Sequence, residues 1–139
     1  AWAPPPPELQ DALWKLLQVN RRSPALHQRR YSMVSYAWGT RYQQSNQWAL
    51  ETLALAAEPA LRRREQAQAW LKLKDYRPAV LRIGALTRLG GRVGMANVAF
   101  DDHPSAQRFA DRIETVTADS VLDWMVRGLG AGAPKQLAL

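Results

Sequence analysis

Two carboxylates and an imidazole stand together at Asp101, Asp102 and His103, and they are the sharpest candidates for chemistry in the sequence. They follow a strand-like run and precede Pro104, which favours the first turn of a helix. Oxygen and imidazole ligands at such a junction can hold a metal ion or a phosphate. The only other histidine is His27, and Asp102 is also a good N-cap, so we favour a capped helix start without a metal.

Other catalytic patterns are missing. The segment 90–94 (Gly-Gly-Arg-Val-Gly) resembles a phosphate loop, but it lacks the Lys-Ser/Thr of a Walker sequence and the GxGxxG order. There is no Gly-x-Ser-x-Gly elbow, His-Glu-x-x-His or calcium loop. The absence of cysteine excludes disulfides, thiolate zinc sites and cysteine nucleophiles. We therefore predict no enzyme, no catalytic residues and no cofactor.

The strongest compositional feature is an uneven distribution of charge. Residues 1–92 carry 15 Lys or Arg against 6 Asp or Glu, whereas residues 93–139 carry 4 against 6. Such a split favours a basic face that meets an acidic protein, a nucleic acid or an anionic membrane surface. The predicted partner-binding cations are Arg29, Arg30, Arg41, Arg62, Arg63, Arg64, Lys72 and Lys74.

Aromatic side chains alternate with these cations between residues 29 and 48. Exposed rings stack on bases at about 1–3 kcal/mol each while arginines neutralise phosphates, so this stretch also fits a nucleic-acid platform. In that alternative the stacking residues are Tyr31, Tyr36 and Tyr42. The competing interpretation is that most of these rings belong to the core.

The first half of the chain has helical spacing. Apolar residues recur every three or four positions over 8–19, and a second helix is predicted to start near Ser45 and to be kinked or divided at Pro59 before continuing over 60–73. Residues 25–42 fit either a strand or a helix, and we favour a helix.

The second half changes to a strand-like pattern. Residues 79–89 and 92–100 are predicted to form a β-hairpin through Gly90-Gly91, with Leu81 opposite Phe100. A helix over 104–114 would cover this hairpin, residues 115–117 allow a third strand, and 120–127 read as a last helix. The fold class predicted is α+β, with N-terminal helices before a hairpin covered by a helix, loosely half of a ferredoxin-like fold.

We predict a Pro-rich stalk at 1–7, a single domain at 8–127 and a flexible tail at 128–139. The domain has a helical part (8–75) and a hairpin-helix part (76–127). No apolar stretch reaches the roughly 18 residues that cross a bilayer. The start without Met, followed by prolines, fits a segment removed upstream and a periplasmic or envelope location, with the cytoplasm as the alternative.

These features together predict a non-enzymatic protein-interaction or assembly module of a bacterial cell envelope, of the secretion, pilus or conjugation type. Its partner would be another protein or a second copy of the chain. The alternative is a basic nucleic-acid-binding protein.

Overall fold

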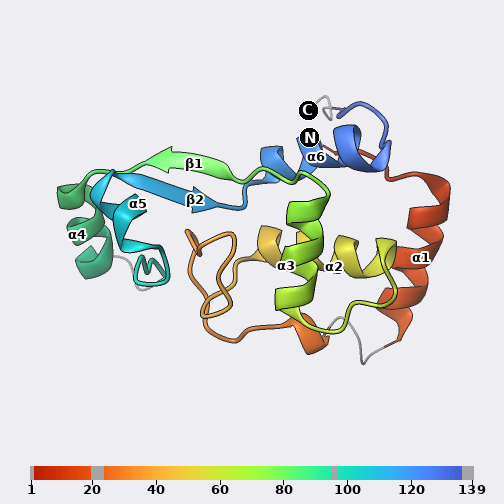
Figure 1. Cartoon of the computed structure of the whole chain (residues 1–139), viewed down its shortest axis with the longest axis horizontal. Coiled ribbons are helices and arrows are strands. Elements are labelled where there is room, and N and C mark those ends of the chain that lie inside the picture. The colour runs from red at the N-terminus through yellow and green to blue at the C-terminus, as the bar shows by residue number, and fades with distance from the viewer. Residues whose placement is uncertain (1, 20–23, 95–96, 136–139) are drawn as a thin grey trace.

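The computed structural model describes residues 2–19, 24–94 and 97–135, and for 91–94 the backbone only. Figure 1 shows a helical body and, extending from it, a two-stranded arm that ends in two short helices. The elements are α1 (Pro7–Gln18), the 3₁₀ turn η1 (Pro24–Leu26), α2 (Ser45–Ala57), α3 (Arg64–Leu73), β1 (Ala79–Arg82), α4 (Ala85–Gly94), α5 (Ser105–Phe109), β2 (Arg112–Thr115) and α6 (Ala118–Leu129).

The body packs around α2, which is buried along most of its length. Its neighbours α1, α3 and α6 cover it on several sides, so its apolar residues do not fall on a single stripe. The predicted helix near the N-terminus is confirmed as α1. The predicted division at Pro59 is also confirmed, because this residue lies between the end of α2 and the start of α3.

The last predicted helix is confirmed as α6, which is longer than expected at both ends. It starts with a reciprocal cap between Thr117 and Ser120 and ends at Gly130, whose φ of 68° is in the left-handed region. Trp124 is fully buried, and its ring meets those of Trp70 and Tyr76 edge-on at 6.1 and 6.0 Å. These rings join α6 to α3 and to the chain that follows it.

The α+β class is confirmed, but the strands pair differently from the prediction. β1 is antiparallel to β2, with Leu81 opposite Ile113, and within the described residues the sheet has two strands. The Gly90-Gly91 turn is wrong, because residues 85–94 form α4, and the predicted second strand is wrong, because residues 92–94 belong to that helix and residues 97–100 form no strand. Residues 95 and 96 of that strand lie outside the described residues.

Burial explains the choice of partner strand. Ile113 is fully buried, and the hydroxyl of Thr115 donates to the carbonyl of Ser35 at 2.9 Å, which ties β2 to the body. Thr115, predicted in a separate third strand, is therefore the last residue of the second. The predicted helix over 104–114 is correspondingly shortened to α5, and Phe109 at the end of α5 is exposed instead of covering the sheet.

The prediction of a helix over 25–42 is wrong. After η1 this segment forms turns up to residue 42, because its backbone bonds to distant parts of the chain. The N–H of Met33 donates to the carbonyl of Asn97, and the N–H of Ala37 donates to that of Glu114. A helix would redirect these N–H groups to carbonyls four residues earlier.

The two ends of the described chain lie side by side. Trp2 and Lys135 exchange backbone hydrogen bonds of 2.9 and 2.8 Å, and Gly132 N donates to the carbonyl of Pro4. The Pro-rich segment thus lies against the body, and Pro7 opens α1. Within the described residues, no helix has the length and apolar character to span a bilayer.

Candidate binding groove

A buried ion pair organises the polar interior of the body. The Glu51 carboxylate on α2 meets the Arg64 guanidinium of α3 through two hydrogen bonds of 2.8 and 3.1 Å. Gln43 and Gln68 donate to the same carboxylate at 2.7 and 2.9 Å. Burial raises the pKa of Glu51, and the guanidinium and the two amides oppose that shift.

Arg64 extends this network to the loop before α2. Its remaining N–H groups donate to the carbonyls of Gly39, Thr40 and Tyr42 at 3.0–3.2 Å. All five donors of the guanidinium are thereby bonded, which is the condition for burying this group at low cost. The loop over 39–44 is held rigidly against α2 and α3 as a result.

Gln43 connects this hydrogen-bond network to the turn over residues 26–31. Its side chain donates to the carbonyl of Leu26 and accepts from the N–H of Gln28, both at 2.9 Å. Its backbone N–H donates to the carbonyl of Arg30 at 3.0 Å, beside an isolated bridge between Tyr31 and Gln43. Residues 26–31 are therefore fixed over the start of α2.

Two adjoining hollows open on this fixed turn. One, of about 400 Å³, is lined by His27, Gln28, Arg29, Tyr31, Gln43, Gln44, Ser45 and Trp48. The other, of about 320 Å³, is lined by Ala25, His27, Gln28, Thr40, Arg63, Arg64 and Glu65. Because both are bordered by His27 and Gln28, we treat them as one surface and call it the His27 groove.

The electrostatics of the His27 groove favour an anionic ligand. Arg29 lines one hollow and Arg63 the other, with Glu65 as the opposing acidic group in the second. The first hollow also contains Ser45, the first residue of α2, and no side chain caps the N-terminus of that helix. Helix N-termini attract negative charge through their free N–H groups.

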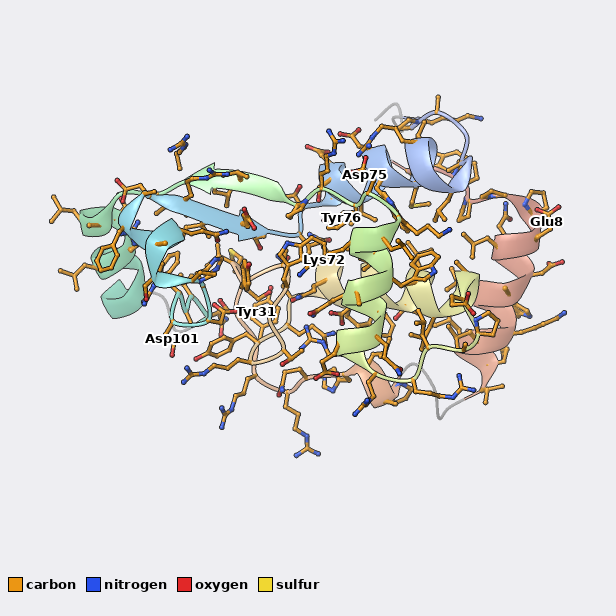
Figure 2. All side chains as sticks on the ribbon, in the orientation of Figure 1. Glu8, Tyr31, Lys72, Asp75, Tyr76 and Asp101 are labelled. Atoms are coloured by element: carbon orange, nitrogen blue, oxygen red, sulfur yellow. The ribbon has the colours of Figure 1, made fainter. Side chains whose placement is uncertain are left out.

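The structure divides the predicted cations into separate groups. Arg29 and Arg30 lie on the fixed turn, and Arg62 and Arg63 immediately precede α3. Lys72 and Lys74 lie at the opposite end of α3, about 15 Å away along the helix axis. Figure 2 shows Lys72 on α3 and Tyr31 on the loop that precedes α2.

The lysines and three of the arginines are engaged within the protein, and Arg62 is one of them, since its guanidinium donates to the carbonyls of Pro59 and Leu61. Lys72 and Lys74 stand over the rings of Trp38 and Trp70 at 4.7 and 5.7 Å. Arg41 pairs with Asp101 at 3.0 Å. The prediction that Arg64 binds a partner is wrong, since its buried guanidinium is saturated by the Glu51 network.

The three predicted stacking tyrosines also separate. Tyr31 is exposed at the edge of the groove, whereas Tyr36 is half-buried and packs against the ring of His103 at 5.2 Å. Tyr42 is half-buried, with the Arg41 guanidinium 5.5 Å from its ring centre. The three rings do not form one stacking platform.

Asp102 and His103 join two segments of the chain. The Asp102 carboxylate accepts from the N–H of Tyr36 at 2.8 Å, and the imidazole Nε2 of His103 is bonded to the carbonyl of Val34 at 2.7 Å. Burial raises the pKa of Asp102, and the Tyr36 N–H opposes the shift. Within the described residues, no group of three or more His, Asp or Glu side chains is placed to hold a metal ion.

The prediction of Asp102 as an N-cap is wrong. The cap position of α5 is Pro104, and no side chain bonds there. The carboxylate of Asp102 is already used by Tyr36 in the body. The Asp102–His103 pair therefore fastens the segment before α5 to the turns over 34–36.

A family described as "Uncharacterized protein conserved in bacteria (DUF2145)" matches residues 1–125. The chain belongs to this family. No curated protein and no solved structure matches the chain. The matched residues include the whole His27 groove and the arm.

Sequence reasoning missed the polar residues that build the groove, among them Glu51, Gln43 and Gln68. One signal was present: Glu51 interrupts a nearly continuous apolar run over 49–57, where a carboxylate requires a partner. The identity of that partner could not be read from the pattern, because three consecutive arginines, 62–64, were equally available.

Proposed function

We propose that this protein is a non-enzymatic binding module that holds an acidic segment of a partner protein in the His27 groove. The observation that carries the proposal is the groove itself, a hollow with rigid walls lined by Arg29, Tyr31 and Trp48. Its walls need no rearrangement to receive a ligand, because the Glu51–Arg64 network already orders them. Preorganised sites lose less entropy on binding.

The lining residues indicate the chemistry of the ligand. A carboxylate would meet Arg29 and the uncapped N-terminus of α2, which favour negative charge. The rings of Tyr31 and Trp48 offer flat apolar surfaces to a neighbouring side chain. An acidic residue next to an aromatic or aliphatic one is the ligand that uses both features.

The arrangement of the tyrosines favours a protein over a nucleic acid. Stacking of successive bases needs several exposed rings along a basic track. Tyr31 is exposed, but Tyr36 and Tyr42 are half-buried, and Arg41 and Arg64 are paired with acidic residues. The nucleic-acid function is therefore the second choice.

A selection of displayed random peptides on the purified protein tests the proposal, followed by fluorescence polarisation with the best peptide. We expect acidic peptides to be enriched and Arg29→Glu or Trp48→Ala to weaken binding about tenfold or more, as loss of about 1.4 kcal/mol implies. The matched control is Lys74→Glu, which makes the same charge change at the far end of α3.

Three results would contradict the proposal. The first is enrichment of peptides without acidic residues, and the second is equal weakening by Lys74→Glu and Arg29→Glu. The third is tight, steeply salt-dependent binding of a fluorescent single-stranded oligonucleotide that Arg29→Glu with Arg30→Glu abolishes, which would establish the nucleic-acid function instead. The envelope location stays a prediction, and fractionation of cells that express the whole gene product checks it.

A further inference from the structure

The end of the arm exposes large apolar side chains. Leu86 on α4 is 86% exposed, Leu89 is 62% exposed, and Phe109 at the end of α5 is 87% exposed. Figure 1 shows α4 and α5 together beyond the strands, far from the helical body. None of these side chains packs into the core described above, so burial in the fold does not account for them.

The orientation of α4 directs its two leucines outward. Arg88 bonds to the carbonyl of Ile83 and to the carboxylate of Asp111 at 2.8 Å, so its side of the helix faces the strands. Leu86 and Leu89 are three residues apart and share a face, and each is rotated at least 100° from Arg88. The contact with Asp111 also brings α4 to the turn that follows Phe109.

Arginines accompany this apolar end. Arg82 and Arg112 are both exposed and stand directly opposite each other across the two strands. Like charges in this position repel, and no ion pair of either residue is seen within the described part of the chain. Arg82 also reaches the carbonyl of Ala110, next to Phe109, at 3.5 Å.

Acidic groups near the end of the arm do not cancel these arginines. The Asp111 carboxylate is paired with Arg88. Glu114 lies farther along β2, opposite Val80 and closer to the body. The exposed side chains of Leu86, Leu89, Phe109, Arg82 and Arg112, here together called the arm end, are thus apolar or cationic.

We propose that the arm end is a docking surface for an anionic lipid membrane. Exposed apolar side chains on a projecting end can enter the acyl boundary, while neighbouring arginines bind anionic head groups. These side chains protrude, and none of them lines a hollow described here. A protein partner would have none of these hollows at the arm end into which to insert a side chain, whereas a lipid layer can deform around protruding residues. This inference uses residues separate from the His27 groove, so either can fail alone.

Co-sedimentation of the whole chain with vesicles tests the proposal. We expect binding to vesicles of phosphatidylglycerol and phosphatidylcholine in equal parts, and at least tenfold weaker binding to phosphatidylcholine alone. Phe109→Ser and Leu86→Ser should each weaken binding about tenfold, and Arg82→Ala about fivefold. The matched control is Leu73→Ser, which removes a side chain that is 80% exposed on α3 in the body.

Other outcomes overturn the inference. Absence of binding to anionic vesicles, or equal loss in Leu73→Ser and Phe109→Ser, removes the arm end as a lipid surface. A concentration-dependent dimer in sedimentation equilibrium that Phe109→Ser dissolves, without vesicle binding, would assign the surface to a second copy of the chain. Unchanged thermal unfolding of the serine variants confirms that they remain folded, as expected for exposed positions.

Discussion

The geometry of the groove depends on individual buried polar residues, and Glu51 is the central one. Its carboxylate joins the loop before α2, through Gln43, to α3, through Arg64 and Gln68. A buried pair of this kind contributes little net stability compared with apolar packing, but removal of one partner leaves the other charge unpaired. The main effect of the Glu51–Arg64 pair is therefore to fix the position of the loop over 39–44.

Glu51→Gln keeps the shape of the side chain and removes its charge. Arg64 then stays buried without a counter-ion, and we expect a loss of about 3–5 kcal/mol in the free energy of unfolding. Urea denaturation measures this loss. The matched control, Glu65→Gln on the exposed side of α3, should change stability by about 0.5 kcal/mol or less. Equal effects of the two substitutions would contradict the role assigned to the network.

Tyr76 makes stability depend on alkaline pH. Burial raises the pKa of its phenol to about 12, and the hydrogen bond with Ser120, 2.8 Å long, opposes the shift. An unfolded tyrosine ionises near pH 10, so from about pH 10 to 12 the folded state keeps a proton that the unfolded state has lost. Stability therefore falls as the pH rises through this window, by about 2–3 kcal/mol in total.

Tyr76→Phe should remove most of that alkaline loss, because no proton is exchanged at this position. Denaturation at about pH 9 and about pH 11 compares the variant with the wild type. Tyr31→Phe is the control, since it changes an exposed tyrosine at the edge of the groove. If Tyr76→Phe loses as much stability as the wild type does between these values, the phenol is not the responsible group.

At the scale of the elements, two glycines in helices separate the effect of side-chain packing on stability from that of helix propensity. A Cβ at Gly128 in α6 would stand 2.9 Å from the indole nitrogen of Trp124, which donates to the carbonyl of Lys74. A Cβ at Gly90 in α4 would meet no atom within 4 Å. The same substitution should therefore have opposite signs in the two helices.

Gly90→Ala should stabilise the protein by about 0.5–1 kcal/mol, because alanine restricts the unfolded chain and favours the helix. Gly128→Ala should destabilise it by about 1–2 kcal/mol, since the shift forced on Trp124 outweighs the gain in propensity. Thermal unfolding monitored by circular dichroism measures both. Destabilisation by Gly90→Ala would argue for the positive-φ turn that the sequence predicts there and against α4.

At the scale of the whole molecule, the arm and the body differ in the interactions that stabilise them. The body surrounds α2 with other helices, whereas the arm is a two-stranded sheet joined to the body through hydrogen bonds of Thr115, Glu114 and Asp102. Two strands alone are marginally stable in water. Local opening of the arm should therefore cost less free energy than unfolding of the body.

Hydrogen exchange followed by mass spectrometry checks this difference. Peptides from α4, α5 and the outer part of β1 should exchange faster than those from α2, and they should do so without global unfolding. Bound anionic vesicles should slow exchange at α4 and α5 if the arm end docks on lipid. Protection of the arm equal to that of α2 would show that the molecule opens as one unit.

The sequence alone determined the elements whose signal is local. The three-and-four spacing of apolar residues specified α1 and α6, and Pro59 separated α2 from α3 because proline cannot continue a helix. The α+β class followed from the change of pattern after residue 78. These features need no information about distant residues.

Only the tertiary structure decided which segments pair and which polar groups are buried. The Gly90-Gly91 signal for a hairpin is local, but β1 pairs instead with a strand thirty residues later, where Ile113 can be buried and Thr115 can bond to Ser35. Likewise Arg62, Arg63 and Arg64 look alike along the chain, and only the third meets Glu51. Strand pairing and the burial of polar side chains depend on contacts between residues far apart in sequence. A local sequence pattern contains no information about these contacts.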